Sequence, residues 1–248
     1  MMSPAVGIAE VLNLFRAVAT EDELALVLAE TSRRLGFRHF AMVQHVDFGQ
    51  ATTHGFRLHN YPDSWVNWFD ENGLGVTDPV HRASHTTLTG FRWSDIPAMI
   101  PLSQRDRDVL AQASGYGLSV GYTVPAHVPG ETLGSCSFAA ASNESLGDDV
   151  MPNAHLIGLF AFEAGRRVTG QRSCAASLKL TTRQLECIMY VGRGKTDAEI
   201  AQILGVSPAT VVEHLRHARE RYNAASRAVL PVRALYDGAL SFADVLVH

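Results

Sequence analysis

The C-terminal part of the chain contains signals for two short helices separated by a tight turn, and this pattern restricts the fold more than any other feature. Thr196 and Glu199 form a capping box, in which each side chain accepts a hydrogen bond from the other residue's backbone N–H. The helix that they start carries apolar residues at helical spacing and ends at Gly205. Ser207 and Pro208 start the next helix as its N-cap and first helical residue. Two helices joined by so short a turn predict a helix-turn-helix.

The second of these helices has distinct apolar and polar faces. Its apolar residues recur at intervals of four, three and four, at Val211, Leu215, Ala218 and Tyr222. A helix with a polar outer face fits the major groove of DNA, where its early residues reach the edges of the bases. A small helical bundle with a solvated charged face would give the same pattern. The candidate DNA contacts are Lys195, Thr196, Ser207, Thr210, Val212, Glu213, His214, Arg216 and Arg219.

The charge is distributed unevenly along the chain. Residues 178–248 contain nine Lys and Arg against seven Asp and Glu, a net charge of +2. Residues 1–177 contain twelve against eighteen, a net charge of −6, and the whole chain carries −4. A basic module that follows an acidic one has the sign expected for a DNA-binding domain.

Helices and strands alternate through the rest of the chain. Two helices come first, the second of which starts at a capping box, and short strands are predicted over residues 40–46 and 52–58. Strand-like segments at 120–128 and 133–140 flank Pro129-Gly130 and predict a hairpin. An amphipathic helix over 152–168 follows, with Leu156, Leu159 and Phe160 on its apolar face.

This order predicts an α/β fold for residues 1–168, an α-β-α sandwich with a central antiparallel sheet and helices on both faces. Residues 169–177 are polar and small and are interpreted as a linker. Residues 178–248 form a small all-α helix-turn-helix domain, whose first helix begins at the capping box Thr181 to Gln184.

The sequence gives no positive sign of an enzyme or a metal site. It lacks G-x-S-x-G, H-E-x-x-H and a dinucleotide fingerprint, and Met189 stands where a phosphate-binding loop ending at Gly194-Lys195-Thr196 would need glycine. His81 and His85 could share a helix face, but no further metal ligands are evident, and exposed polar residues explain the spacing. We therefore expect no metal, and no cofactor other than a small-molecule signal.

The chain also lacks signals for export or for a membrane. Its three cysteines are far apart, which argues against a disulfide framework. The N-terminus has no basic leader, and no apolar run is long enough to span a bilayer. We expect a cytoplasmic protein without membrane contacts.

Residues 180–216 closely resemble the LuxR-type helix-turn-helix. The N-terminal region resembles the autoinducer-binding domain of quorum-sensing LuxR regulators, through Tyr61-Pro-x-x-Trp65, Asp78-Pro79, Trp93 and Gly121. The helix-turn-helix match rests on Glu186, Gly194, Ile200, Ala201, Leu204, Val206, Ser207, Thr210, Val211, His214 and Leu215.

The resemblance implies an N-acyl-homoserine lactone as the ligand. Trp65 would donate its indole N–H to the lactone carbonyl, and Asp78 would accept from the ligand amide. Tyr61 would bond to the acyl carbonyl, and Ser137 would reach that carbonyl or a 3-substituent. The apolar wall would consist of Phe69, Trp93, Val109, Ala113 and Leu118.

The resemblance further implies a homodimer that binds an inverted repeat in double-stranded DNA, with RNA polymerase as a partner. An orphan regulator that answers a foreign lactone, a non-lactone signal or no ligand is the alternative.

Four residues depart from the family pattern. Phe69 replaces a tyrosine, Val212 stands where relatives place a base-contacting arginine, and Tyr222 and Pro231 are also unusual. Pro231 is expected to kink or delay the last helix and to alter dimer pairing.

Overall fold

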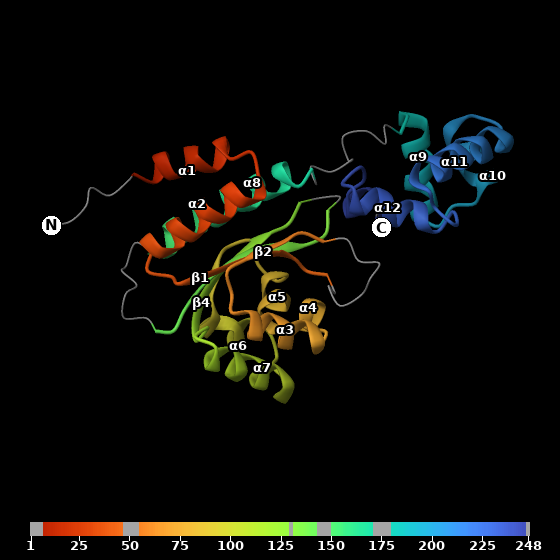
Figure 1. Cartoon of the computed structure of the whole chain (residues 1–248). Coiled ribbons are helices and arrows are strands. Elements are labelled where there is room, and N and C mark those ends of the chain that lie inside the picture. The colour runs from red at the N-terminus through yellow and green to blue at the C-terminus, as the bar shows by residue number, and fades with distance from the viewer. Residues whose placement is uncertain (1–6, 47–54, 129–130, 143–149, 171–179, 247–248) are drawn as a thin grey trace. The chain divides into compact units, whose positions relative to one another are not determined.

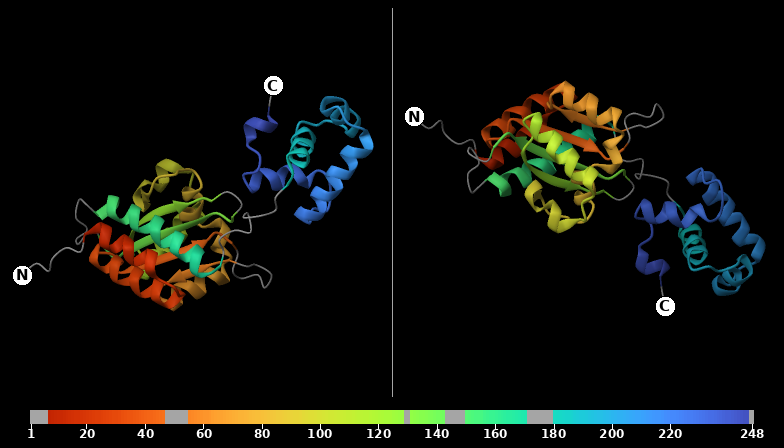
Figure 2. Two further views of the ribbon diagram at one scale, coloured as in Figure 1. Left: turned by 90° about the horizontal axis from the view of Figure 1, so that it is seen from above. Right: turned by 90° about the horizontal axis from the view of Figure 1, so that it is seen from below.

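The computed structural model describes residues 7–46, 55–128, 131–142, 150–170 and 180–246. The chain divides into two compact units (Figures 1 and 2), an N-terminal unit of residues 1–128 and 132–172 and a C-terminal unit of residues 173–248, with which residues 129–131 are grouped. Most of the predicted linker, residues 171–177, lies outside the described residues. Across the described ranges, no helix is long and apolar enough to cross a membrane.

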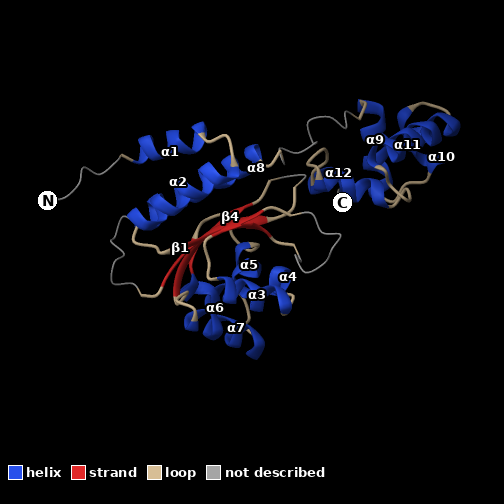
Figure 3. Cartoon of the chain, in the orientation of Figure 1, coloured by secondary structure: helices blue, strands red, loops and turns tan. Residues whose placement is uncertain are grey.

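A five-stranded antiparallel sheet forms the centre of the N-terminal unit, where Figure 3 shows its strands in red. Its strand order is β2-β1-β5-β4-β3. The predicted hairpin is confirmed, because its two strands pair directly from Val120 opposite Ala140 to Ala126 opposite Gly134. The predicted strand over 52–58 is shorter and later than expected, and residues 52–54 lie outside the described part. The strands are β1 (His39–Gln44), β2 (Arg57–His59), β3 (Phe91–Arg92), β4 (Val120–Ala126) and β5 (Gly134–Ala140).

Helices cover both faces of this sheet, as predicted (Figure 1). One face is covered by α1 (Ile8–Ala17), α2 (Glu21–Arg34) and α8 (Val150–Val168). The other face is covered by α3 (Asp63–Glu71), α4 (Leu74–Thr77), α5 (Pro79–Ser84), the 3₁₀ turn η1 (Trp93–Asp95), α6 (Ile96–Met99) and α7 (Gln104–Gly115).

Helix α8 packs on the sheet through small residues. The prediction that Leu156 and Leu159 lie on its buried apolar face is therefore wrong. Leu156 and Leu159 are 39% and 40% exposed, whereas Phe160 is partly buried. A Cβ atom on Gly158 would lie 2.8 Å from Cγ2 of Val124 in β4, so close packing requires glycine there. The fully buried or nearly buried positions of the helix include Ala154, Ile157, Gly158, Ala161, Phe162, Ala164 and Gly165.

The C-terminal unit is helical, and its helix-turn-helix forms as the caps predict. Thr196 and Ser207 accept hydrogen bonds from the backbone N–H groups three residues later, and Gly205 ends the first helix with φ at +66°. Its helices are α9 (Thr182–Gly192), α10 (Asp197–Leu204), α11 (Pro208–Tyr222), α12 (Val229–Tyr236) and α13 (Phe242–Val245).

The predicted buried face of α11 is confirmed, since Val211, Leu215, Ala218 and Tyr222 are its buried residues. Pro231 is the third residue of α12. The first turn of a helix has no intrahelical partner for its N–H groups, so proline is tolerated there. The expectation that Pro231 delays this helix is therefore wrong, because α12 begins two residues before it.

Candidate functional site

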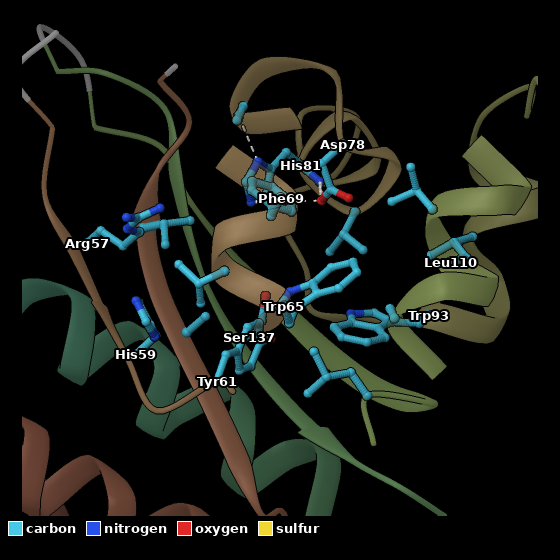
Figure 4. Close-up of a pocket in the computed structure, with 18 residues that line it drawn as sticks. Arg57, His59, Tyr61, Trp65, Phe69, Asp78, His81, Trp93, Leu110 and Ser137 are labelled. Atoms are coloured by element: carbon cyan, nitrogen blue, oxygen red, sulfur yellow. Dashed lines mark hydrogen bonds and ion pairs between the residues drawn. The ribbon is translucent and has the colours of Figure 1, made fainter. Parts of the chain in front are cut away.

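A pocket lies in the N-terminal unit between the sheet and the helices α3 to α7 (Figure 4). It contains about 760 Å³ of space between atoms, part of it open to solvent. All nine predicted ligand-contacting residues line it: Tyr61, Trp65, Phe69, Asp78, Trp93, Val109, Ala113, Leu118 and Ser137. The structure thus brings together residues that are spread over 77 positions of the sequence, from Tyr61 to Ser137.

Asp78 is a buried carboxylate at the start of α5. Its Oδ2 accepts a hydrogen bond from the backbone N–H of His81 at 3.1 Å, which makes it the N-cap of the helix. An ionised carboxylate has about four acceptor sites, so this cap leaves capacity for a ligand N–H. Burial raises the pKa of Asp78, and the nearby His81 opposes that rise. Asp78 is therefore a helix cap that lines the pocket and keeps acceptor capacity there.

Tyr61 and Trp65 bring two hydrogen-bond donors to the same pocket. Tyr61 immediately precedes Pro62, the N-cap of α3, and Trp65 lies in the first turn of that helix. Burial, and then the charge of Asp78, raise the pKa of Tyr61, so its hydroxyl keeps its proton. In the described part of the chain, neither this hydroxyl nor the Trp65 indole N–H has a hydrogen-bond partner. Neither atom is among the fully buried unpartnered atoms of the described residues, so both donors can reach ligand oxygens in the pocket.

Ser137 is held in place by a row of polar side chains. Nε1 of Trp93 donates to Oγ1 of Thr123 at 2.9 Å, and that hydroxyl lies 2.9 Å from Oγ of Ser137. The indole of Trp93 therefore lines the pocket with its ring, while its N–H is already hydrogen-bonded to Thr123. It packs so closely on β4 that a Cβ atom on Gly121 would lie 2.3 Å from its Cε2, which explains the glycine at this position.

The remaining wall of the pocket is apolar. Val109 and Ala113 face it from α7, and Leu118 follows that helix. Phe69, which replaces the tyrosine of the family pattern, packs on Trp65 with ring centroids 5.9 Å apart. A few fixed polar groups in a dry, aromatic cavity are typical of a small-molecule site.

Three polar pocket residues were missed by the sequence analysis. Arg57 and His59 reach the pocket from β2, and His81 reaches it from α5. Arg57 and His59 could have been predicted from the alternation of side chains along a strand, which places residues two apart on one face. The signal for His81 was its position three residues after Asp78, on the same helix face.

His81 is therefore not an exposed helix residue, as the spacing of His81 and His85 suggested. Its side chain is only 12% exposed, and Nδ1 donates to the carbonyl of Gly75 at 2.9 Å. It stacks on His45, with ring centroids 4.0 Å apart, and Nδ1 of His45 lies 2.7 Å from Nε2 of His85. Among the described residues, no group of three or more His, Cys, Asp or Glu has the geometry of a metal site.

The polar face of α11 is a candidate nucleic-acid interface. Val212, Glu213, Arg216 and Arg219 are exposed, whereas His214 is half-buried. The guanidinium of Arg216 lies between Glu213, at 2.6 Å, and Glu220. A contact of Arg216 with DNA would compete with these two ion pairs.

The other predicted DNA contacts lie around the turn. Thr196 and Ser207 cap their helices, and Oγ of Ser207 lies 2.8 Å from Oγ1 of Thr210. Nζ of Lys195 lies 3.3 Å from Glu199. The guanidinium of Arg219 donates to backbone carbonyls beyond the end of α11, at Ala224 and Ala225.

Two family models match the chain. The model described as "Autoinducer binding domain" matches residues 20–165, and that described as "Bacterial regulatory proteins, luxR family" matches residues 178–234. The transcriptional activator protein AnoR of Acinetobacter nosocomialis is 27% identical over 237 residues, covering 93% of this chain and 98% of AnoR. The quorum sensing-dependent regulator RpaR of Rhodopseudomonas palustris is 30% identical over 189 residues, covering 73% of each chain.

A solved structure agrees with the fold. The crystal structure of Escherichia coli SdiA matches with a TM-score of 0.71 and 22% identity, over 93% of this chain and 96% of SdiA. The predicted sandwich followed by a helical domain is confirmed. The expectation of a regulator rather than an enzyme is also confirmed, since the matched relatives are transcriptional regulators.

Proposed function

Because the chain belongs to the LuxR family of bacterial regulatory proteins, with an autoinducer-binding domain followed by a DNA-binding helix-turn-helix, we propose that its signal is an N-acyl-homoserine lactone. One observation carries this proposal. The donors of Tyr61 and Trp65, for which the described chain shows no hydrogen-bond partner, share an apolar pocket with the acceptor Asp78. An acyl-homoserine lactone offers the complement, with two carbonyl oxygens, one amide N–H and an apolar tail.

Each polar group of the pocket has a role in this proposal. Trp65 donates to the lactone carbonyl, Tyr61 donates to the acyl carbonyl, and Asp78 accepts from the amide N–H. Ser137, fixed by Thr123, supports the acyl carbonyl or a nearby substituent. Withdrawing these groups from water without a ligand leaves donors unpaired, which costs roughly 1–3 kcal/mol each. The ligand therefore completes the core of the N-terminal unit.

The proposed output is binding to DNA as a homodimer. Two copies of α11 would enter major grooves of an inverted repeat whose half-sites are about one helical turn apart. Recruitment of RNA polymerase belongs to the proposal because AnoR is named as a transcriptional activator.

A non-lactone signal is the second candidate, and one observation favours it. A structure of SdiA, with a TM-score of 0.70, is described as a complex with octanoyl-rac-glycerol. An acylglycerol has a carbonyl and an apolar tail but no amide, so Asp78 would accept from a glycerol hydroxyl instead.

Ligand-dependent stabilisation tests the proposal and separates the two candidates. The purified full chain is heated with acyl-homoserine lactones of several chain lengths, with octanoyl-rac-glycerol, or alone. A ligand bound only by the folded state at a hundred times its Kd stabilises by about 2.7 kcal/mol. A rise in Tm with at least one lactone, larger than with the acylglycerol, is expected. No shift with any lactone, or a larger shift with the acylglycerol, contradicts the proposal.

A further inference from the structure

The edge strand β2 brings two nitrogen-rich side chains to the pocket. In the antiparallel register, His59 lies opposite Ala41 of β1, and Arg57 lies opposite Val43. Ala41 in turn lies opposite Ser137 of β5. Opposed residues of neighbouring strands point to the same face of the sheet, so His59, Ala41 and Ser137 form one row on the pocket face. Figure 4 shows Arg57 and His59 on the opposite side of the pocket from Trp93 and Leu110.

The space between Ser137 and His59 suits the acyl part of a ligand. The two residues are two strands apart, which is roughly 10 Å between backbones. Ala41, whose side chain is a single methyl group, lies between them in the row. A ligand whose acyl carbonyl lies at Tyr61 and Ser137 can thus extend over Ala41 and meet the imidazole of His59.

His59 has an unmet hydrogen-bonding capacity at this point. Its Nδ1 is buried and has no hydrogen-bond partner within the described residues. Burial, and then the positive charge of Arg57, lower the pKa of His59, which favours the neutral ring. A neutral imidazole carries one N–H and one lone pair, and either form of Nδ1 requires a partner. The atom is already closed to solvent and unpaired without a ligand, so a plain alkyl chain supplies no partner, whereas a ligand group that hydrogen-bonds to the ring does.

The charges around His59 decide which partner fits. Arg57 is already matched by Asp70, since Nη1 lies 2.7 and 2.9 Å from its two carboxylate oxygens. No unbalanced positive charge therefore calls for an anionic ligand group. Of the neutral groups, a ketone only accepts a hydrogen bond, whereas a hydroxyl both donates and accepts. A hydroxyl can pair with either tautomer of His59.

We propose that His59 determines specificity, by hydrogen bonding to a hydroxyl group carried on the acyl part of the signal beyond the position that Ser137 contacts. The inference rests on the proposed lactone function and adds to it the chemical class of the acyl group. It predicts that the chain selects hydroxylated acyl chains over plain alkyl chains of the same length.

Matched ligand pairs test this proposal. The probes are N-hexanoyl- and N-octanoyl-homoserine lactone, each with its ω-hydroxy counterpart, and Kd is measured by calorimetry on the full chain. The wild type is expected to bind the better-fitting hydroxylated probe about tenfold more tightly than its partner, a difference of about 1.4 kcal/mol. His59→Phe is expected to abolish or invert that ratio, and His59→Gln, which keeps hydrogen-bonding atoms, is expected to retain part of it.

A matched control is His39→Phe. The rings of His39 and His59 lie at similar distances from Tyr61, with centroids 6.1 and 6.3 Å apart, but His39 does not line the pocket. His39→Phe should leave the ratio unchanged. If His59→Phe does not fold, the comparison of wild type with His59→Gln still decides.

The outcomes separate this inference from the function on which it rests. Binding of all the lactones with no preference for the hydroxyl overturns the role of His59 but leaves lactone sensing intact. A preference that persists in His59→Phe also overturns it. Binding of none of the probes, nor of any other lactone in the stabilisation test, contradicts the proposed function itself.

Discussion

Acidification should destabilise the N-terminal unit through His45. This side chain is only 7% exposed, and burial, followed by the charges of His81, His85 and His127, lowers its pKa well below 6.5. Both ring nitrogens are engaged, Nδ1 with His85 at 2.7 Å and Nε2 with Ser135 at 2.8 Å. The folded protein therefore excludes a proton that the unfolded chain takes up.

The sign and size of the effect follow from linkage. Because the folded pKa is lower than the unfolded one, stability is complete above about pH 6.5 and is lost as the pH falls toward the folded value. Each pH unit in that window costs about 1.4 kcal/mol for one excluded proton. Between pH 7 and pH 5.5 the loss from His45 reaches at most about 1.3 kcal/mol, the limit for complete exclusion of the proton. The lowered pKa values of His59 and His85 add to it, and the raised pKa of Asp78 opposes it.

Tryptophan fluorescence isolates this effect, because all three tryptophans, Trp65, Trp68 and Trp93, lie in the N-terminal unit. Urea unfolding is followed at pH 7 and pH 5.5 in the wild type and in His45→Gln, which has no titrating group. The variant is expected to lose less stability than the wild type on acidification, by at most about 1.3 kcal/mol. His39→Gln serves as a control outside the histidine cluster. Equal pH dependence of His45→Gln and the wild type would refute the reasoning.

Three substitutions test other parts of the structure. Trp65→Phe keeps the ring but removes the indole donor, so lactone affinity should fall by about 1–3 kcal/mol, and an unchanged titration would remove Trp65 from the site. Arg216→Ala should cost about 1–3 kcal/mol of DNA affinity and relax base preference; an equal loss for all sequences would make Arg216 a phosphate contact. Gly121→Ala should destabilise the N-terminal unit by about 1–3 kcal/mol, because the new Cβ would lie 2.3 Å from the ring of Trp93; unfolding by urea measures this, and unchanged stability would contradict the close packing.

The C-terminal unit could be predicted from local signals alone. Caps at Thr181, Thr196 and Ser207 and the glycine at 205 act within one turn of the residues they control. The spacing of the apolar residues then fixed the buried face of α11. Such local rules require no knowledge of distant contacts.

The packing of α8 could not be predicted in the same way. Apolar spacing gives weight to large side chains, and Leu156 and Leu159 suggested the buried face. The helix instead approaches the sheet closely, and close approach favours small residues such as Gly158 and Gly165. A Cβ on Gly165 would lie 2.9 Å from Cε1 of Phe56, a contact between segments more than a hundred residues apart.

The pocket residues could be predicted only through the family resemblance, because each of them has an ordinary structural explanation when it is considered alone. Trp65 and Trp93 could be core aromatics, and Asp78 before Pro79 could be a helix cap only. Arg57 and His59 of β2 were not predicted as pocket residues, because their place in the lining depends on tertiary packing, which no local pattern specifies.

The central claim is that Asp78 accepts the amide N–H of an acyl-homoserine lactone, and Asp78→Ser tests it most directly. Serine is as good an N-cap as aspartate, so the free energy of unfolding of the variant should lie within about 0.5 kcal/mol of the wild-type value. It removes the carboxylate that faces the pocket, so the Kd for a lactone that binds the wild type should rise at least tenfold. Unchanged lactone affinity in the folded variant would show that Asp78 is a cap alone and would contradict the account.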